Sequence, residues 1–492
     1  MIIDQLPVLQ VIVPLLSAPL ALLCGRGQLA WLVAMLASVA AFVISILLLQ
    51  QVSIQHEVVT EIGGWAAPWG IEYRVDYLNS LVLLLVSGIS SICLWFAQQS
   101  VASEVDADRQ SLFYTAWLLC LTGLLGITIT GDAFNVFVFL EISSLSSYVL
   151  IAMGRDRRAL SASFQYLVMG TIGATFILIG IGLLYMASGS LNMKDIAGLL
   201  PNVTGSRMLT SAFAFLTVGI GLKLAMFPLH LWLPNAYTYA PSAVSAFLAG
   251  TATKVAVYML LRFIFSVFGV EFSFQTMPLS TILLLLGAAA ILVTSLVAIF
   301  QDNLKRMLAY SSVAQVGYML LGISLASHAG LSAAILHVFN HALIKGGLFL
   351  VLGCLVFQTG TVSLDKLSGV AKQMPWTMAA FLVGGLSLIG VPLTTGFVSK
   401  WLLISAALQQ GMWPIAVVVV LGSLLAVIYI WRVVEVAYMK PGSEEVSFQE
   451  APIRLLLPTW ILIAANFYFG IFTEINIGVS ESAATWLFEG KL

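Results

Sequence analysis

Two histidines and a lysine recur at four-residue intervals within one apolar stretch. His337, His341 and Lys345 take positions i, i+4 and i+8 of the segment LSAAILHVFNHALIKGGLFLVLGCLVF. On a helix this spacing puts all three side chains on one stripe, with about 6 Å between successive positions. A neutral imidazole both donates and accepts hydrogen bonds, and its ordinary pKa of about 6.5 lets it exchange protons at physiological pH. The stripe therefore predicts proton transfer.

Two other interpretations of the histidines are open. A zinc site would lack the glutamate of the H-E-x-x-H motif, and no cysteine or carboxylate stands close to His337 and His341 in the sequence. Histidines that are simply hydrogen-bonded inside a helix bundle are the structural alternative. Because Lys345 continues the same stripe, we favour proton transfer and predict neither a metal ion nor a cofactor.

Four more ionisable residues lie deep in apolar runs: Glu141, Lys223, Lys254 and Lys400. A charge at mid-bilayer costs at least about 2.5 to 3.5 kcal/mol, so each needs a partner or water. A single lysine can extend its amine to the membrane surface, and Glu141 with Lys223 can form a static ion pair. So many charges together instead indicate a shared hydrophilic axis for ions, with Glu141 and Lys223 as a pair that adjusts the proton affinity of the lysines.

The composition is that of a polytopic membrane protein. Hydrophobic residues make up 60% and charged residues 9% of the 492 residues, and the mean hydropathy is +1.03. The net charge of −1 comes with no basic arm, which excludes a nucleic-acid-binding protein. The four cysteines stand singly in apolar runs, so we expect buried thiols rather than a disulfide, zinc or iron–sulfur framework.

Apolar runs of about 20 residues predict an all-α protein with about fourteen transmembrane helices. The first run lacks the basic start and cleavage site of a signal peptide, so we count it as a span. The polar insertion near 51–76 has room for only a small extramembrane hairpin. The expected spans are 5–24, 29–50, 77–98, 111–130, 132–153, 160–188, 207–239, 242–268, 278–300, 305–326, 330–357, 375–408, 413–437 and 453–473.

Lysine and arginine placement orients these spans. Loops on one side of the bundle hold Arg26, Arg109, the cluster at 155–158 and most of the remaining basic residues. By the positive-inside rule this side is cytoplasmic, and both termini then face outward. We expect a multi-pass protein of the bacterial inner membrane.

Two spans contain residues that should interrupt a helix. Pro228 and Pro234 fall in the seventh span, and Gly390 and Pro392 fall in the twelfth. A proline inside a helix removes a backbone donor and clashes one turn back. At membrane depth such breaks are tolerated where the backbone lines a cavity, and in transporters with inverted repeats they mark the transport site.

A faint internal repeat accompanies the two breaks. A shift of about 170 residues lays 131–154 on 301–324. It matches Asp132 to Asp302 and Tyr148 to Tyr318, and it sets Glu141 opposite Ser311. We therefore expect two inverted five-helix repeats, spans 4–8 and 9–13. The expected regions are 1–110 (spans 1–3), 111–268 (first repeat), 278–440 (second repeat) and 450–492 (last span and tail).

Five segments resemble a known family in the family's own order: GDAFNVFVFLEISSLSSYVL, KLAMFPLHLWLPNAYTYAPSAVSAFLAGTATKVAVYMLLR, DNLKRMLAYSSVAQVGYMLLG, HVFNHALIKGGLFL and GVPLTTGFVSKWLLI. They are similar to the antiporter-like subunits of Mrp-type cation/proton antiporters, respiratory complex I and membrane-bound hydrogenases. The resemblance covers roughly 75–440. The sequence around Glu141 and at 338–345 is most similar to that of the D-type subunit of Mrp antiporters.

The resemblance implies fourteen helices, two inverted repeats and a role for each buried charge. Glu141 and Lys223 would be a switch pair, Lys254 the central lysine, and Lys400 the terminal lysine, with His337, His341 and Lys345 as the relay between them. Ser311 stands where the repeat would place a second glutamate, so a second switching pair must come from elsewhere or from a neighbouring subunit.

The resemblance further implies a transporter subunit rather than an enzyme. We expect a proton-translocating subunit of a multisubunit Na+/H+ antiporter, with a proton-pumping subunit of a redox complex as the alternative. The expected partners are other membrane subunits, lipid, H+ and either Na+ or K+. The sequence does not identify the cation or the direction of flux.

Overall fold

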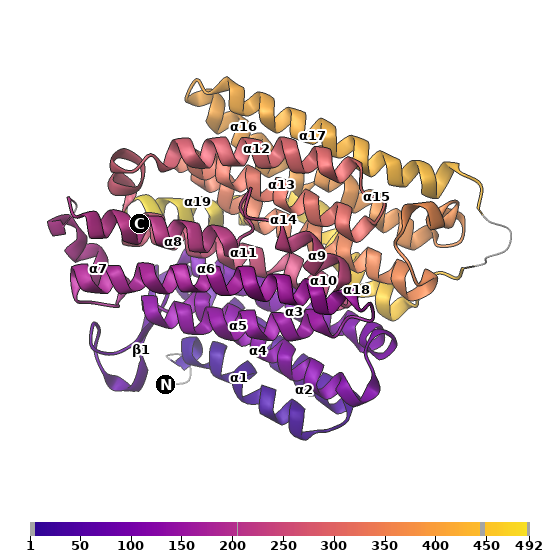
Figure 1. Cartoon of the computed structure of the whole chain (residues 1–492), viewed down its shortest axis with the longest axis horizontal. Helices are drawn as coiled ribbons and strands as arrows, with labels where there is room; N and C mark the ends of the chain where they lie inside the picture. The colour runs from indigo at the N-terminus through magenta and orange to yellow at the C-terminus, as the bar shows by residue number, and fades with distance from the viewer. Residues whose placement is uncertain (1–4, 204, 443–447, 490–492) are drawn as a thin grey trace.

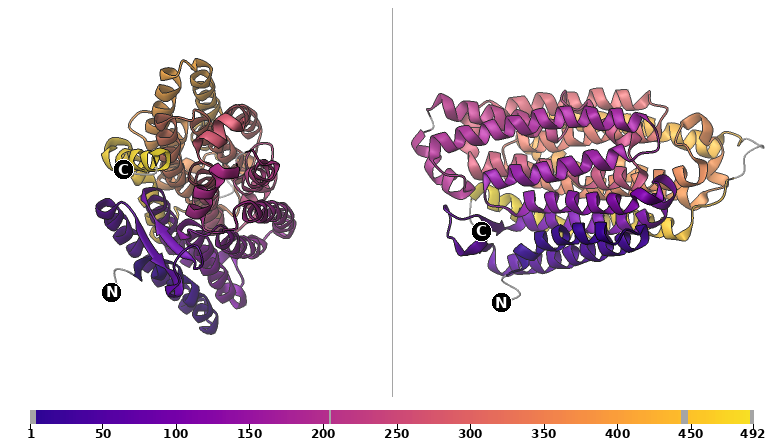
Figure 2. Two further views of the ribbon diagram at one scale, coloured as in Figure 1. Left: turned by 90° about the vertical axis from the view of Figure 1, so that its left-hand side faces the viewer. Right: turned by 60° about the horizontal axis from the view of Figure 1, so that its bottom comes forward.

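Long helices lie roughly side by side, with α1 and α2 at one edge, α16 and α17 at the other, and α14 between them (Figure 1). The structure is a computed structural model and describes residues 5–203, 205–442 and 448–489. Within these ranges twelve helices are long and apolar enough to cross a membrane. Two further spans are interrupted, which accounts for the fourteen predicted. Figure 2 shows the bundle from its end and from a second side.

The long helices agree with the predicted spans to within a few residues at most ends. Their bounds are α1 (Leu6–Leu23), α2 (Gly27–Gln55), α3 (Tyr77–Glu104), α4 (Gln110–Ile129), α5 (Ala133–Ala152), α6 (Arg158–Ser188), α12 (Leu279–Ile299), α13 (Leu304–Ser324), α14 (His328–Thr359), α17 (Trp413–Val434) and α18 (Ile453–Ile471).

Shorter helices complete the bundle. They are α7 (Met193–Leu199), α8 (Arg207–Lys223), α9 (Trp232–Tyr239), α10 (Ser242–Gly250), α11 (Ala252–Leu261), α15 (Pro375–Ile389), α16 (Thr395–Gln409) and α19 (Glu474–Glu489). One-turn 3₁₀ segments are η2 (Ile62–Gly64), η3 (Ala107–Arg109), η4 (Leu200–Val203), η7 (Leu364–Leu367) and η8 (Val370–Lys372), and π-helical turns are η5 (Arg262–Val267), η6 (Phe272–Thr276) and η9 (Glu435–Met439).

The predicted extramembrane hairpin is present. Strands β1 (Val58–Glu61) and β2 (Glu72–Val75) pair antiparallel, with Val58 opposite Val75. Asp76 follows β2 and caps α3, because its carboxylate accepts the N–H groups of the first turn. The hairpin therefore lies at the end of the bundle where α3 begins.

The seventh span is interrupted as predicted, but by only one of its two prolines. Helix α8 ends at Lys223 and α9 begins at Trp232, with Pro228 in the gap between them. Pro234 is the third residue of α9, where a helix N–H has no intrahelical acceptor to lose. The prediction that Pro234 breaks the helix is wrong for this reason.

The twelfth span is interrupted between Ile389 and Thr395. Gly390 has φ +93° and Leu393 has φ +72°, a left-handed conformation that ends α15 without continuing into α16. The break predicted from Gly390 and Pro392 is thus present.

Helix α19, which the sequence did not predict, follows α18 after a two-residue break. Helix α19 packs against α3 and α14, and the His328 ring reaches the Thr485 hydroxyl at 2.7 Å. Near the end of α18, Gly470 presses against the break between α15 and α16. A Cβ at Gly470 would lie 2.5 Å from the carbonyl oxygen of Leu393, so only glycine fits there.

Residues 131–193 and 302–364 have the same backbone frame at an offset of 171 residues. Gly189 and Gly360 end α6 and α14 in the same left-handed conformation. Asp132 caps α5 and Asn303 caps α13 through equivalent side-chain hydrogen bonds. Two long-range backbone hydrogen bonds also recur: Ala133 N–H to Leu191 O with Leu304 N–H to Val362 O, and Met193 N–H to Gly131 O with Leu364 N–H to Asp302 O.

This frame corrects the register that the sequence suggested. The offset of 171 sets Asp132 opposite Asn303 rather than Asp302, and Glu141 opposite Ser312 rather than Ser311. The match of Asp132 to Asp302 and of Tyr148 to Tyr318 had favoured 170. The hydrogen-bonded frame decides the register, because it fixes both ends of the segment at once.

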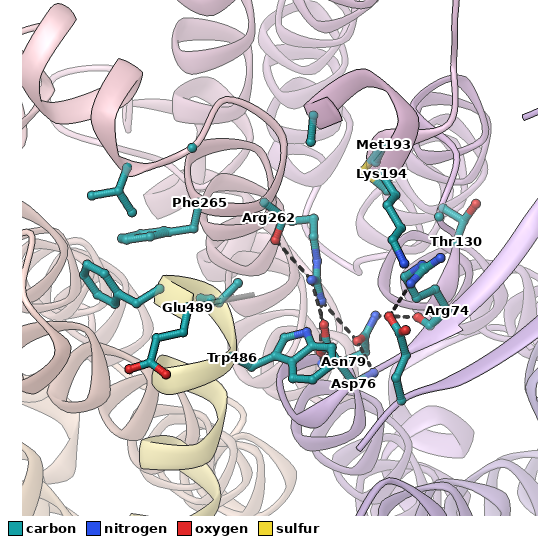
Figure 3. Close-up of a pocket in the computed structure, with 18 residues that line it drawn as sticks. Arg74, Asp76, Asn79, Thr130, Met193, Lys194, Arg262, Phe265, Trp486 and Glu489 are labelled. Atoms are coloured by element: carbon teal, nitrogen blue, oxygen red, sulfur yellow. Dashed lines mark hydrogen bonds and ion pairs between the residues drawn. The ribbon is translucent and has the colours of Figure 1, made fainter. Parts of the chain in front are cut away.

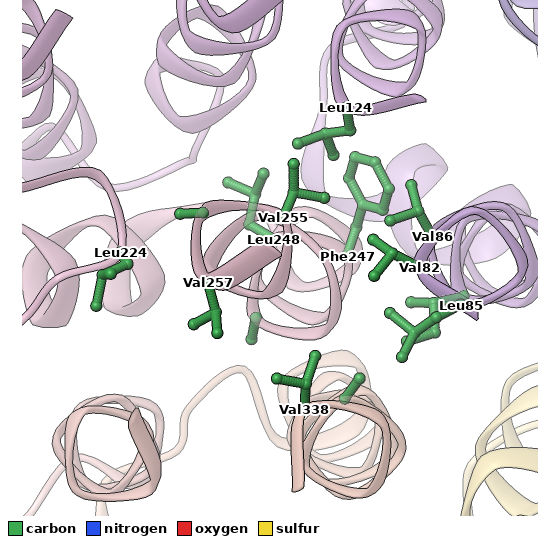
Figure 4. Packing of buried hydrophobic residues seen from close by; sticks show 14 of the residues in the cluster. Val82, Leu85, Val86, Leu124, Leu224, Phe247, Leu248, Val255, Val257 and Val338 are labelled. Atoms are coloured by element: carbon green, nitrogen blue, oxygen red, sulfur yellow. The ribbon is translucent and has the colours of Figure 1, made fainter. Parts of the chain in front are cut away.

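Helices α10 and α11 form the centre of the apolar packing. Figure 4 shows Phe247 and Val255 of this pair facing α3 and α4, with Val338 of α14 on the other side. All three side chains are at most 5% exposed. A charged group on α11 or on the neighbouring face of α14 is therefore enclosed by protein and does not face lipid.

Candidate functional site

The predicted stripe on α14 is buried at the centre of the bundle. His337 is 3% exposed, and His341 and Lys345 are fully buried. The two imidazole rings lie nearly parallel, with their centroids 6.1 Å apart. Helix α14 packs against α10, α13 and α16, so its stripe can meet groups from both parts of the chain.

His337 connects α13 to α16. Its Nε2 lies 3.0 Å from the Gln315 amide oxygen, and its Nδ1 lies 2.8 Å from the Ser399 hydroxyl. An amide oxygen only accepts, so Nε2 carries the hydrogen and the Ser399 hydroxyl donates to Nδ1. Ser399 directly precedes Lys400, which therefore lies near the His337 ring and acts on it electrostatically.

His341 is buried without hydrogen-bond partners for its ring among the described residues. In the described ranges neither of its ring nitrogens has a hydrogen-bond partner, and the same holds for the Oδ1 atom of buried Asn340. Lys254, Lys345 and Lys400 all act electrostatically on His341. Buried polar atoms are nearly always satisfied by protein or by ordered water, so these atoms favour water between the helices.

Lys254 lies beside an irregular step between α10 and α11. Thr251 has φ −122° and ψ −58°, and the amine of Lys254 donates to the Ala249 carbonyl, which this step leaves accessible. The amine also lies 3.3 Å from the Thr253 hydroxyl. Lys254 is 1% exposed and acts electrostatically on Lys345.

Lys345 and Lys400 are held mainly by backbone oxygens. Lys345 donates to Leu308 O at 2.8 Å and to the Ser311 hydroxyl on α13. Lys400 donates to Leu388 O and Ile389 O, both at 3.0 Å. Those two carbonyls end α15, where the break removes their helical donors and the helix dipole favours a cation.

The predicted pair of Glu141 and Lys223 is close but not joined. The Lys223 amine donates to the Ser144 hydroxyl at 2.8 Å, and Glu141 acts on it only electrostatically. No ion pair links the two side chains in the part of the chain that the structure describes, and one buried oxygen of Glu141 has no hydrogen-bond partner there. A cavity of about 30 Å³, enough for a water molecule, separates Lys223 from Ala252 and Val255 of α11.

The site thus brings together six of the seven predicted residues in one enclosed region, with Glu141 at its margin. Four amines and two imidazoles share this axis with a single carboxylate. Burial with so little compensating charge means that the bases cannot all be protonated together. The arrangement is suited to passing a small number of protons between neighbouring bases.

Sequence reasoning missed the residues that connect the bases. Gln315, Ser399 and Ser144 are common polar residues, and nothing in their local spacing identifies them. His230 had a clearer signal, since it lies within the break between α8 and α9. It is 6% exposed, and its ring lies against Tyr310 of α13 with 6.2 Å between centroids.

A cavity of about 460 Å³ lies apart from the four buried lysines, at the end of the bundle near the hairpin (Figure 3). Its wall includes Arg262, which holds Asp76 through two hydrogen bonds of 2.7 and 3.0 Å and also donates to Asn79. Across the described residues, no three histidine, cysteine or acidic side chains converge as a metal site requires.

Comparison with known proteins identifies the family of this chain. Residues 130–426 match the family described as NADH:quinone oxidoreductase/Mrp antiporter, TM, which covers both breaks and every buried lysine of the axis. The chain belongs to this family. The expected resemblance is therefore confirmed at the family level.

Individual relatives come from both branches of the family. The chain is 42% identical to the NADH-quinone oxidoreductase N subunit of Desulforudis audaxviator, over 86% of this chain and 87% of that protein. It is 30% identical to the Na(+)/H(+) antiporter D subunit of Alkalihalophilus pseudofirmus, over 96% and 94%. A chain of the Mrp complex from Dietzia sp. DQ12-45-1b matches with a TM-score of 0.91 and 25% identity, over 100% and 98%.

Proposed function

We propose that this chain is the proton-translocating subunit of a multisubunit monovalent cation/proton antiporter. The observation that carries the proposal is the buried line of bases on both sides of α14: Lys254 on α11, the stripe of His337, His341 and Lys345, and Lys400 on α16. The likeness to an Na(+)/H(+) antiporter D subunit and to the Mrp complex supports it.

In the proposed path a proton enters from one side of the membrane and loads Lys254. It passes through water and the His341 and His337 rings, whose nitrogens alternately accept and donate. Ser399 then provides the last hydroxyl before Lys400, which releases the proton to the other side. Lys345 is the cationic neighbour of both Lys254 and His341, so its protonation would push a proton onward by like-charge repulsion.

Glu141 would control this transfer from the margin. A nearby carboxylate favours the charged form of a lysine. Movement of Glu141 toward Lys223 would hold a proton there, and its withdrawal would release the proton toward Lys254. Lys223 rests on Ser144 in the structure, which corresponds to the withdrawn state.

The proposal includes neighbouring subunits and lipid as partners. Glu141 is half-buried on the outward stripe of α5, between Val138 and Leu145, which are 37% and 53% exposed. A carboxylate that faces hydrocarbon is costly, so a polar neighbour must cover this stripe. We place the chain in a bacterial inner membrane as two inverted five-helix units with both termini outward. The shared frame of 131–193 and 302–364 supports the two units.

A second candidate function has its own support. The 42% identity to a subunit of NADH-quinone oxidoreductase favours a proton-pumping subunit of a redox complex. The same axis would then be driven by electron transfer in other subunits. In that case the complex would not exchange Na+ or K+ for protons.

Everted membrane vesicles containing the whole complex test both candidates through the quenching of a pH-sensitive dye. Addition of Na+ or K+ to respiring vesicles should reverse quenching with wild-type chain and not with Lys254→Ala. Acidification driven by NADH, without a cation response, would move the chain to the redox class. Full cation-driven exchange in the assembled Lys254→Ala complex would exclude the proton path.

A further inference from the structure

Lys400 lies over the face of an aromatic ring, a contact that the path proposed above does not use. Its amine is 4.7 Å from the centroid of the Tyr318 ring on α13. The face of a tyrosine attracts a cation within about 6 Å, most strongly where water is excluded. Tyr318 is 1% exposed and Lys400 is 5% exposed, so protein encloses this contact. Among the described residues, no other lysine of the axis lies over an aromatic ring.

The charge of Lys400 has no acidic partner within the described ranges. No carboxylate acts on its amine electrostatically, whereas Glu141 acts on the amine of Lys223. Both lysines belong to interrupted spans, and the frame of the two units sets Ser312 rather than an acid opposite Glu141. A buried ammonium without a carboxylate depends on neutral groups that present negative charge density. At Lys400 these are the carbonyl oxygens that end α15 and the Tyr318 ring.

Helix α17 fixes the angle of the Tyr318 ring. The Tyr318 hydroxyl donates to Val419 O at 3.4 Å and lies in hydrogen-bond contact with Ser423. The Ser423 hydroxyl also accepts from the Lys400 amine at 3.1 Å, so one serine holds both the ring and the cation. A Cβ at Gly422 would lie 2.3 Å from the Tyr318 hydroxyl oxygen. Helix α17 therefore has space for this hydroxyl only because residue 422 is a glycine.

The same ring lies beside the histidine that precedes Lys400 in the proposed path. The centroids of the Tyr318 and His337 rings are 5.6 Å apart, with 55° between the ring planes. Lys400 acts electrostatically on His337, because two positive charges repel each other. A group that stabilises the charge on Lys400 therefore favours the transfer of a proton away from His337.

Few titratable groups face Lys400 from the surrounding helices. Helix α13 contributes Tyr318, and α14 contributes His337 and His341, on both of which Lys400 acts. Helix α17 contributes Tyr429, which interacts electrostatically with Tyr318. Helices α15 and α18 also pack against α16, but none of their described side chains acts on the amine as a charge. The ring is thus the aromatic group in direct contact with the Lys400 cation.

We infer that Tyr318 is a positioning residue that stabilises charged Lys400 and thereby sets the pH range of the final proton transfer. The inference rests on the proposed function, and it names the group that takes the place of a carboxylate in the second unit. Tyr318 keeps its own hydrogen and does not carry the transported proton. It acts through the charge of Lys400, so the face of the ring should matter more than the hydroxyl.

The test measures the rate of cation-triggered pH change as a function of pH, in everted vesicles that contain the whole complex. Tyr318→Leu removes the ring face, so the alkaline limb of the rate profile should move by about one pH unit toward acid. On that limb the rate should fall by about tenfold. Tyr318→Met removes the face with a longer side chain and should move the limb equally. Tyr318→Phe keeps the face, and should keep the position of the limb with a loss of rate below about threefold.

Tyr114→Leu is the matched control for the loss of a buried ring. Tyr114 on α4 is 2% exposed, and its hydroxyl also bonds a backbone oxygen, that of Ala97 at 3.3 Å. No lysine lies over its ring in the described part of the chain. The limb should therefore stay in place in Tyr114→Leu. The yield of co-purified subunits corrects every rate for assembly.

Three results would overturn the role of Tyr318 and leave the proposed function intact. They are an unmoved limb in assembled Tyr318→Leu and Tyr318→Met, an equal movement in Tyr114→Leu, and a movement in Tyr318→Phe as large as in Tyr318→Leu. Full transport by Lys254→Ala would instead remove the proposed function itself.

Discussion

Residues 131–193 and 302–364 hold a buried base at equivalent places but take it from different helices. In 302–364 the base is His341 of α14 itself, and in 131–193 it is Lys223, which comes from α8. Gly170 is the counterpart of His341 at the offset of 171. A Cβ at Gly170 would lie 1.9 Å from the Tyr148 hydroxyl and 3.5 Å from the Lys223 amine. The glycine therefore leaves a place for a base that α8 supplies, whereas α14 carries its own.

Neighbouring positions differ in the same way. Tyr166 takes the position of His337 and stacks on Trp232, with 3.9 Å between ring centroids. Ser144 takes the position of Gln315, and each bonds the base of its own unit, Lys223 or His337. The backbone frame thus fixes where a base can be held, and the side chains decide which helix provides it.

The largest effect should come from Lys345, because residues 131–193 have only an alanine at the equivalent position. Lys345→Ala should lower proton-coupled transport by at least about a hundredfold, because it removes a buried base from the axis. Ala174 is the equivalent position on α6, and Ala174→Ser should change transport by less than about twofold. Dye quenching in everted vesicles measures both. Equal losses in the two variants would mean that the units do not differ as described.

Gly170→Ala should lower transport by about tenfold, because the new methyl group displaces the Tyr148 hydroxyl and with it the neighbouring amine of Lys223. Gly182→Ala is the matched control on the same helix, since a Cβ there would meet open space among the described residues. The same assay applies. An unaffected Gly170→Ala complex would contradict the view that this glycine makes room for Lys223.

Glu141→Gln should lower the rate by roughly three- to tenfold, since it removes one charge that acts on Lys223 from outside hydrogen-bond distance. Ser312 is the counterpart of Glu141, and among the described residues its hydroxyl bonds only Leu308 O of its own helix, at 3.0 Å. Ser312→Ala should therefore leave the rate unchanged. A larger loss in Ser312→Ala than in Glu141→Gln would reverse the roles of the two units.

The smallest effect is expected on stability, at Asp132 and Asn303, the residues that cap α5 and α13. Burial raises the pKa of Asp132, against the lowering effect of its hydrogen bonds from Asn135 and Phe134. The folded state therefore holds the proton more tightly than the unfolded state, and stability falls as pH rises from about 4 through the raised pKa.

Asp132→Asn copies the cap of the second unit, Asn303, and should raise the thermal midpoint of the purified complex slightly more at pH 8 than at pH 5. The gain should stay below about 1 kcal/mol, because both residues cap helices well. Asn303→Asp should show the opposite pH dependence. A gain for Asp132→Asn that is larger at pH 5 would contradict the raised pKa.

Much of the fold could be predicted because apolar runs report the spans directly. The stripe on α14 was equally accessible, since the helical period alone places His337, His341 and Lys345 together. Helix α19 was missed because its sequence is too polar for a span, and it is held by tertiary packing on α14 instead. The role of Pro234 depends on where α9 restarts, which the local sequence does not state.

The partners of the bases could not be predicted for the same reason. Ser144, Gln315 and Ser399 reach their bases across helix interfaces, and those contacts follow from packing rather than from spacing. The register of the two units also depends on long-range hydrogen bonds. Two matched pairs, Asp132 with Asp302 and Tyr148 with Tyr318, were therefore a poor guide to it.

The contact at Gly470 has a mechanical consequence. A motion of Leu393 toward α18 would displace that helix, because the backbone of the break lies so close to Gly470 that an added Cβ would be 2.5 Å from Leu393 O. The chain passes from α18 through a two-residue break into α19, and the Thr485 hydroxyl of α19 contacts the ring of His328 at the start of α14. These contacts connect the break before Lys400 to the start of α14 by way of α18 and α19. A displacement of the break would therefore reach the helix that carries His337 and His341 from its N-terminal end.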